Sequence, residues 1–208
     1  MSPIKFSTIY SRVYQCGFLK RQVSYLDIVE TLYRKHLSSN VDDTVSKVYD
    51  EYTNKINTGK NYTYKNDIIT VQNLIQTIGS RLKYLLTNKY ISEVSSYFTF
   101  HHKVYGSVDY VINNSNTHIY IGNASRSYES IDFYDANSQM WLLHNNRSSC
   151  NVIILYSGSI PYIELPEVTV DIKRLRDITK TVRRRKFRRR GFHCHFCENI
   201  CGYRVLKN

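Results

Sequence analysis

The sequence contains no apolar run that approaches the roughly 20 residues needed for a transmembrane helix. Its start, Met1-Ser2-Pro3-Ile4-Lys5, also lacks the apolar segment of a secretory signal peptide. We therefore expect an intracellular protein that has no membrane partner. Alanine and glycine are scarce beside abundant asparagine, tyrosine, isoleucine and lysine. This composition is typical of AT-rich genomes, viral ones included, and a viral protein would lie in the host cytoplasm or in the virion.

Acidic residues are also few, and the excess of positive charge is concentrated in one place. The chain has 17 Asp and Glu against 29 Lys and Arg, and its formal net charge is +12. Residues 173–190 contain eleven Lys or Arg and a single acid, Asp177, so they hold 11 − 1 = +10 of that charge. The eleven basic residues are Lys173, Arg174, Arg176, Lys180, Arg183, Arg184, Arg185, Lys186, Arg188, Arg189 and Arg190. Such a stretch neutralises phosphates and releases counterions, so it predicts nucleic acid, DNA in particular, as the partner.

A run of charge can also be an ordinary solvated surface. Seven like charges within the eight residues 183–190 repel one another, however, and such a run usually needs a polyanion. No base-reading motif accompanies the run, so we expect little sequence specificity.

The rest of the chain has the composition of a folded domain. With 208 residues, 42% of them hydrophobic, and 19 tyrosines, it can bury a substantial core. The first half shows the apolar spacing of helices. Ser7 can cap a short helix through Gln15, and further helices are expected around 25–33, from about Asn40 to Tyr52, and over 67–88.

The second half changes to the alternating pattern of strands. Strands are predicted over 94–101, 103–112 and 117–121, with a turn at 113–116. A helix is expected around 135–145. It is followed by a buried strand over 152–156, a returning strand over 162–165 that ends before Pro166, and a basic helix from about Val170. This order predicts an α/β fold around a mixed sheet. We expect one integrated domain with an N-terminal helical region (1–91), an α/β core (92–168) and a basic, cysteine-rich segment (169–208).

Three of the five cysteines form the cluster Cys194-x2-Cys197-x3-Cys201. An odd number of cysteines, with three of them in eight residues, fits a reduced compartment and a metal site better than disulfides. Thiolates at this spacing can surround one metal ion or cluster, either iron–sulfur or zinc. The fourth ligand is Cys16 or, for zinc, His193 or His195. Cys150 lies beside a predicted strand and is expected to be a small core residue.

The placement of one cysteine early in the chain and three near its end resembles the RecB-like nucleases of CRISPR adaptation systems, with their archaeal-virus relatives, and the iron–sulfur nuclease domain of bacterial AddB. The likeness covers nearly the whole chain. It implies a restriction-endonuclease-like, PD-(D/E)XK core. It also implies a 4Fe-4S cluster held by Cys16, Cys194, Cys197 and Cys201.

Two segments of the middle region carry the same resemblance. The stretch Gly106-Ser107-Val108-Asp109-Tyr110-Val111 is similar to the family's G-x-(I/V)-D-hydrophobic strand, which implies that Asp109 is the metal-binding aspartate. Gln139, followed by Met140-Trp141-Leu142-Leu143, resembles the glutamine of the family's Q-x-x-x-Y helix. These two residues are the catalytic positions that the resemblance assigns.

The next strand departs from the family pattern. It should carry (D/E)-x-K, because the acid completes the Mg²⁺ site and the lysine activates the attacking water. Ile121 stands where the acid belongs and Asn123 where the lysine belongs. Lys83 stands in for the histidine of the family's upstream G-x-x-x-H element, which begins here at Gly79. A lone carboxylate holds Mg²⁺ poorly, so we expect an inactivated nuclease in which Asp109 and Gln139 are relics.

Three hypotheses follow. The first is a DNA-binding protein with a RecB-like nuclease fold, catalytically inactivated and held together by a four-cysteine site. The second is an active single-strand DNA exonuclease that uses Mg²⁺ or Mn²⁺, bound by Asp109 and an acid from the set Glu129, Asp132 and Asp135. The third is a zinc-containing basic viral protein of unrelated fold that binds nucleic acid.

Overall fold

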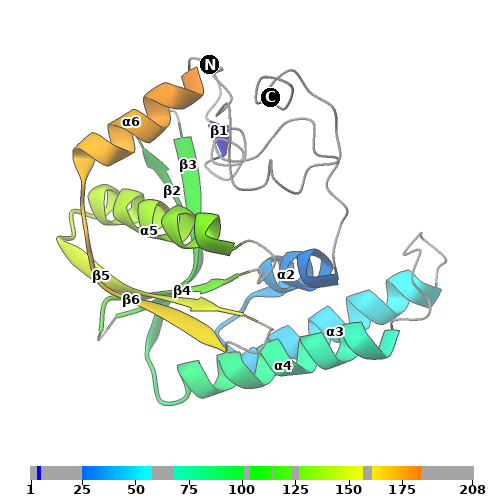
Figure 1. Ribbon diagram of the computed structural model, residues 1–208. Helices are drawn as coiled ribbons and strands as arrows, with labels where there is room; N and C mark the ends of the chain where they lie inside the picture. Colours follow the sequence, from blue (N-terminus) through cyan, green and yellow to red (C-terminus); the bar gives the residue numbers. More distant parts are fainter. Residues whose placement is uncertain are drawn as a thin grey trace, which may run out of the picture.

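A mixed β-sheet runs through the middle of the molecule, with helices on both of its faces (Figure 1). The computed structural model describes residues 4–5, 25–57, 68–100, 104–113, 115–122, 127–156 and 161–183. The predicted helix from Ser7, the four predicted cysteine ligands, His193, His195 and the basic residues 184–190 lie outside the described residues. Within the described ranges, no helix is long and apolar enough to cross a bilayer.

The sheet has the strand order β1-β3-β4-β5-β6, with β2 paired to the other edge of β3. Its strands are β1 Ile4–Lys5, β2 Ile91–Phe100, β3 Val104–Ile112, β4 Thr117–Ile121, β5 Ser149–Leu155 and β6 Tyr162–Thr169. The strands β2, β3 and β4 form an antiparallel meander, whereas β4 and β5 are parallel. A parallel pair needs a crossover connection, and helix α5 (Ser127–His144) supplies it.

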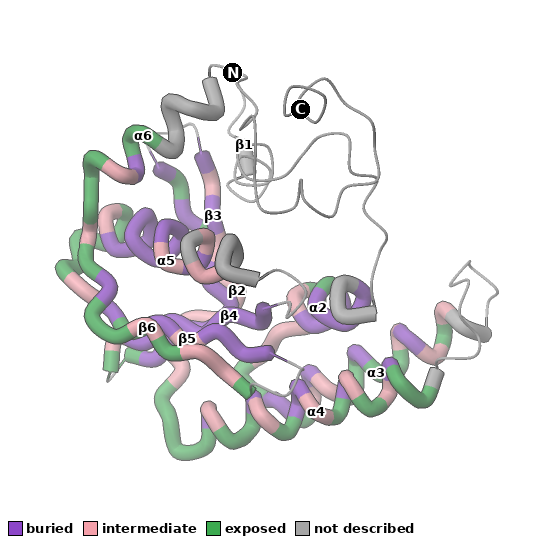
Figure 2. The backbone as a smooth tube through the Cα atoms, in the orientation of Figure 1, coloured by how far each residue is buried: buried purple, intermediate pink, exposed green. Residues whose placement is uncertain are grey.

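The central strands are buried on both faces because each face is covered by helices (Figure 2). Alternate side chains of β4 and β5 enter two separate cores. On one side Ile119, Ile121 and Leu155 pack against the helices α2 (Tyr25–His36), α3 (Val41–Asn57) and α4 (Ile68–Leu86). On the other side Tyr120 and Ile154 pack against α5 and α6 (Ile172–Arg183). The predicted α/β class with a mixed sheet is therefore confirmed, and the order of its elements is consistent with a restriction-endonuclease-like core.

Local signals explain where the helices begin. The Asn40 side-chain oxygen accepts hydrogen bonds from the backbone N–H groups of Asp42 and Asp43, at 3.0 and 3.3 Å, and so caps α3. Asp171 caps α6 in the same way, because its carboxylate accepts the N–H of Arg174 at 2.9 Å. Both helices start close to the residues that the sequence predicts.

Several predicted boundaries were wrong, and the errors at α5 and β6 have a clear physical cause. Helix α5 begins at Ser127 rather than near 135. Its buried residues surround the helix instead of forming one stripe, so the apolar period does not mark its start. Strand β6 continues past Pro166 to Thr169, because it is an edge strand where a missing N–H is tolerated. A shift of register opposite Asn151 accommodates the proline, and the Asn151 side chain accepts the N–H of Glu167 at 3.2 Å.

Candidate functional site

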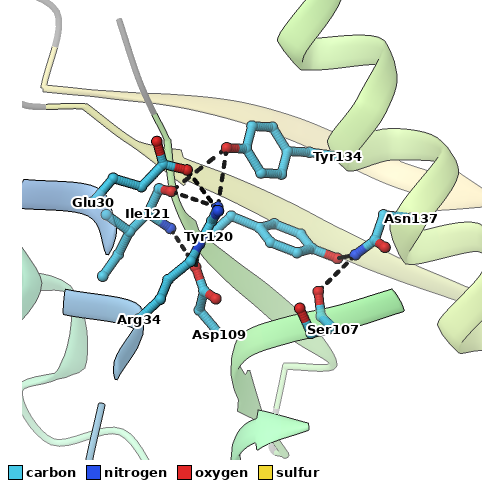
Figure 3. A network of polar contacts seen from close by, with 8 residues as sticks. All are labelled: Glu30, Arg34, Ser107, Asp109, Tyr120, Ile121, Tyr134 and Asn137. Atoms are coloured by element: carbon cyan, nitrogen blue, oxygen red, sulfur yellow. Dashed lines mark hydrogen bonds and ion pairs between the residues drawn. The ribbon is translucent and has the colours of Figure 1, made fainter. Parts of the chain in front are cut away.

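The predicted metal-binding aspartate lies where two central strands separate. The β3–β4 ladder pairs Tyr110 with Ile119 and does not extend to Asp109. At this point the Asp109 carboxylate accepts the backbone N–H of Ile121 at 2.8 Å, as Figure 3 shows. The carboxylate thus satisfies a buried N–H group that the neighbouring strand no longer pairs.

A guanidinium group from helix α2 contacts the same carboxylate. The Nε of Arg34 is 3.5 Å from the Asp109 carboxylate, and its Nη2 donates to the carbonyl of Ile121 at 2.9 Å. Nη2 also lies 3.4 Å from the hydroxyl of Tyr134 on α5, while Nη1 lies 2.6 Å from a carboxylate oxygen of Glu30 (Figure 3). We call Glu30, Arg34, Asp109, Ile121 and Tyr134 the Arg34 cluster. It joins α2, β3, β4 and α5 at one point.

The charges of the Arg34 cluster depend on one another. Glu30 and Asp109 are each only 4% exposed, whereas the Arg34 side chain is 36% exposed. Desolvation opposes the charged guanidinium, but attraction to Asp109 and then to Glu30 raises the pKa of Arg34 above its ordinary value. Buried carboxylates without a cation are costly, and breaking a buried pair typically costs about 3–5 kcal/mol. The partial exposure of Arg34 places the cost here toward the lower end of that range.

The cluster does not match the expected Mg²⁺ site. The position of the missing acid is Ile121, whose side chain is buried in the helical core and whose backbone alone reaches the cluster. Asn123 lies outside the described residues. Within the part of the chain that the structure describes, no group of three or more His, Cys, Asp or Glu side chains is placed to hold a metal. A guanidinium contacts Asp109 instead.

The second predicted catalytic residue lies at a different place. The Gln139 amide donates to the Asp135 carboxylate at 3.2 Å, and its carbonyl oxygen accepts the backbone N–H of Asp171 at 3.0 Å. Asp135 also pairs with the guanidinium of Arg174. Gln139 therefore connects α5 to the N-terminus of α6, and its role in this structure is to position that helix.

Lys83 also lies apart from the Arg34 cluster. It is exposed on α4, and its ammonium is 2.9 Å from the carboxylate of Asp42 on α3. Gly79, one turn earlier, faces the other helices, because a Cβ placed there would lie 2.5 Å from a methyl group of Val45. The glycine thus allows close helix packing.

The predicted phosphate-binding residues begin on α6. Lys173 and Arg176 are exposed, Arg174 is partly buried against Asp135, and Leu175 anchors the helix in the core. Lys180 and Arg183 belong to the same helix. The structure describes no side-chain environment for these two residues.

A further polar group is buried in the α5-side core, and the sequence analysis did not identify it. The Nδ1 of His118 is 3.0 Å from the Ser138 hydroxyl, which is 2.8 Å from the hydroxyl of Tyr120. The Asn137 amide donates to Tyr120 at 3.0 Å and to the carbonyl of Ser107 at 2.8 Å (Figure 3). These contacts link β3 and β4 to α5. His118 lies in a predicted strand, but no sequence pattern indicates that its side chain is buried and hydrogen-bonded.

Burial controls the ionisation of this group. Desolvation lowers the pKa of His118 to about 3 and raises the pKa of the Cys150 thiol to about 12. Cys150 is 3% exposed, with its sulfur 3.6 Å from His118, so its predicted place in the core is confirmed. Burial thus favours the neutral form of both side chains at physiological pH.

These features describe an α/β protein with a mixed sheet in which one arginine pairs with two buried carboxylates. No family model matches the sequence, and no characterised protein matches it in sequence. Among solved structures, the chain is similar to SSO0001, with 13% identity, a TM-score of 0.40, and coverage of 96% of this chain and 94% of that one. It is also similar to an alkaline exonuclease from Laribacter hongkongensis, with 13% identity, a TM-score of 0.40, and coverage of 88% and 85%. Likenesses at this TM-score say nothing by themselves about the chemistry of the site.

The buried histidine predicts a pH dependence of stability. The folded state keeps His118 neutral, with a pKa of about 3, whereas the unfolded chain protonates it near pH 6.5. The stabilisation is complete above the unfolded pKa and is lost as the pH falls below it, because only the unfolded state then takes up a proton. Between pH 7 and pH 5, the wild type should lose about 2 kcal/mol of unfolding free energy relative to His118→Gln. Urea unfolding at both pH values measures the difference.

The matched control is His144→Gln, because His144 is exposed. That variant should follow the pH dependence of the wild type. Equal slopes for the wild type and His118→Gln would contradict the assignment of a neutral, buried His118.

Proposed function

We propose that this protein binds nucleic acid, DNA in particular, through a nuclease-like fold that no longer cleaves its partner. The observation that carries the proposal is the contact between Arg34 and Asp109, with Ile121 at the position of the second acid. An arginine can stabilise charge on a phosphate, but it cannot coordinate a water and lower its pKa as a bound Mg²⁺ does. The resemblance to RecB-like nucleases supports the fold, and the site's departure from that family supports the loss of cleavage.

Nucleic-acid binding is supported by the placement of the positive charge. Leu175 is buried in the core, while its neighbours Lys173 and Arg176 are exposed. Helix α6 thus presents cations from a rigid element, and the chain continues from it into the basic residues 184–190. Rigid placement reduces the entropic cost of each phosphate contact.

We also propose that Cys16, Cys194, Cys197 and Cys201 hold a 4Fe-4S cluster, with zinc as the alternative. Such a site would close a loop of more than 170 residues, because Cys16 and Cys194 are 194 − 16 = 178 positions apart. Its role would be to hold the basic segment against the first helices. Soft thiolate ligands suit both metals, so the ligand set does not distinguish them.

The basic stretch predicts binding that weakens steeply with salt. Binding of a fluorescent DNA of about 20 nucleotides, single- or double-stranded, should lose affinity linearly in log Kd against log salt. The double variant Lys173→Gln/Arg176→Gln should reduce the slope by about 2, or one per lost phosphate contact. Lys47→Gln/Lys89→Gln removes two exposed charges from other surfaces and should leave the slope unchanged. Equal effects of the two double variants would contradict a phosphate-binding role for α6.

The Arg34 cluster predicts no metal-dependent cleavage. Anaerobically purified protein should leave end-labelled single- and double-stranded DNA and RNA intact with Mg²⁺ or Mn²⁺, and Asp109→Asn should behave identically. Cleavage by the wild type that disappears in Asp109→Asn would instead establish the exonuclease hypothesis. Its second acid would then come from Glu129 or Asp132, because Asp135 pairs with Arg174.

The cysteine proposal predicts a brown protein. Anaerobically purified protein should absorb visible light near 400 nm, roughly as 4Fe-4S proteins do, and Cys197→Ser should bleach it. Cys150→Ser is the control, because Cys150 is buried in the core and is not one of the predicted ligands. A colourless protein that contains one equivalent of zinc would support the zinc alternative.

A further inference from the structure

The surroundings of the Arg34 guanidinium have the composition of a divalent-cation site. Two carboxylates, a backbone carbonyl and a hydroxyl surround it, contributed by Glu30, Asp109, Ile121 and Tyr134. Hard cations such as Mg²⁺, Mn²⁺ and Ca²⁺ prefer such oxygen ligands. Here the oxygens converge on an organic cation from the chain itself, as Figure 3 shows.

We propose that the Arg34 guanidinium is a built-in substitute for a divalent cation, and that its removal opens a site for Mn²⁺ between Glu30 and Asp109. The substitution differs from the simple loss of an acid at position 121. Glu30, from α2, provides the second carboxylate that β4 does not supply, and the guanidinium pairs with both acids and offsets one of their two charges. The site therefore keeps a cation between its carboxylates while it excludes the metal.

Electrostatics favour this assignment. The two carboxylates and one guanidinium sum to a formal charge of −1, and without Arg34 the same buried space carries −2. A pair of buried carboxylates attracts a divalent cation more strongly than a monovalent one. The Arg34 side chain is 36% exposed, although the two acids are buried. Shortening this side chain would therefore open the space that it occupies to a cation and its waters.

Helix α2 explains why the guanidinium stays in place. Glu30 and Arg34 are one turn apart on the helix, so their side chains lie on the same face. Val29, Leu32 and Tyr33 are fully or almost fully buried and anchor that helix to the sheet. Arg34 is therefore held next to Asp109 by a packed helix rather than by a loop.

The test measures thermal stability and Mn²⁺ binding without nucleic acid. Wild-type protein should bind no Mn²⁺ at this site and should melt at the same temperature in EDTA and in Mn²⁺. Arg34→Ser should melt at lower temperature in EDTA and recover by about 5–10 °C when free Mn²⁺ is about a hundredfold above its Kd. Binding itself is followed by the loss of the free Mn²⁺ signal in electron paramagnetic resonance.

Two variants separate a metal site from general packing effects. Arg34→Met fills the space without charge and should be destabilised with little recovery in Mn²⁺. Arg34→Ser/Asp109→Asn removes one carboxylate and should lose the recovery, while the predicted cysteine ligands are untouched. A recovery that persists in this double variant, or no recovery in a folded Arg34→Ser, would overturn the proposal. Mn²⁺ binding by the wild type that a folded Asp109→Asn variant abolishes would overturn it as well.

The inference rests on the proposed function in one respect: both require that the wild-type protein has no metal-dependent nuclease activity. Failure of DNA binding would leave the Mn²⁺ result unaffected, because no step of the test uses nucleic acid. Conversely, an Arg34→Ser variant that binds no Mn²⁺ would leave the salt-dependent binding by α6 intact. The two sets of results are therefore distinguishable.

Discussion

One guanidinium group connects helices on both faces of the sheet to the place where its central strands separate. Arg34 extends from α2 on one face, contacts Asp109 and the end of β4, and reaches Tyr134 of α5 on the other face (Figure 3). Both acids of this group are buried, so neither tolerates the loss of the cation. The relative positions of the two helical layers therefore depend on a charge balance as well as on apolar packing.

A buried ion pair is often no more stabilising than a well-packed apolar pair. Stability alone does not explain why Glu30 and Asp109 have been kept. Asp109 has a second role, because its carboxylate accepts the N–H of Ile121 where the ladder ends. An apolar residue at this position would leave that N–H buried without a partner. The Asp109 carboxylate is therefore needed for this hydrogen bond as well as for its contact with Arg34.

The positively charged part of the molecule is separate from the Arg34 cluster. Helix α6 is joined to the core by Leu175 and by the contacts among Gln139, Asp135, Asp171 and Arg174. The family resemblance assigns both Asp109 and Gln139 to catalysis, but in this structure the two residues make unrelated contacts. Asp109 balances an arginine, whereas Gln139 positions the helix that begins the basic stretch.

The sequence by itself determined most of the helices and strands, because apolar period, capping residues and turns are local signals. It predicted the start of α3 near Asn40, the mixed sheet, the strand that bears Asp109 and the absence of a second acid at Ile121. It missed the start of α5 and the passage of β6 through Pro166, since burial on all sides and edge position are properties of the assembled fold. Only the tertiary structure decided which cation meets Asp109. In the sequence, Glu30 and Arg34 look like an ordinary ion pair one helical turn apart. Only the packing of α2 against the sheet brings this pair to the Asp109 carboxylate, which is 75 residues from Arg34 in the sequence.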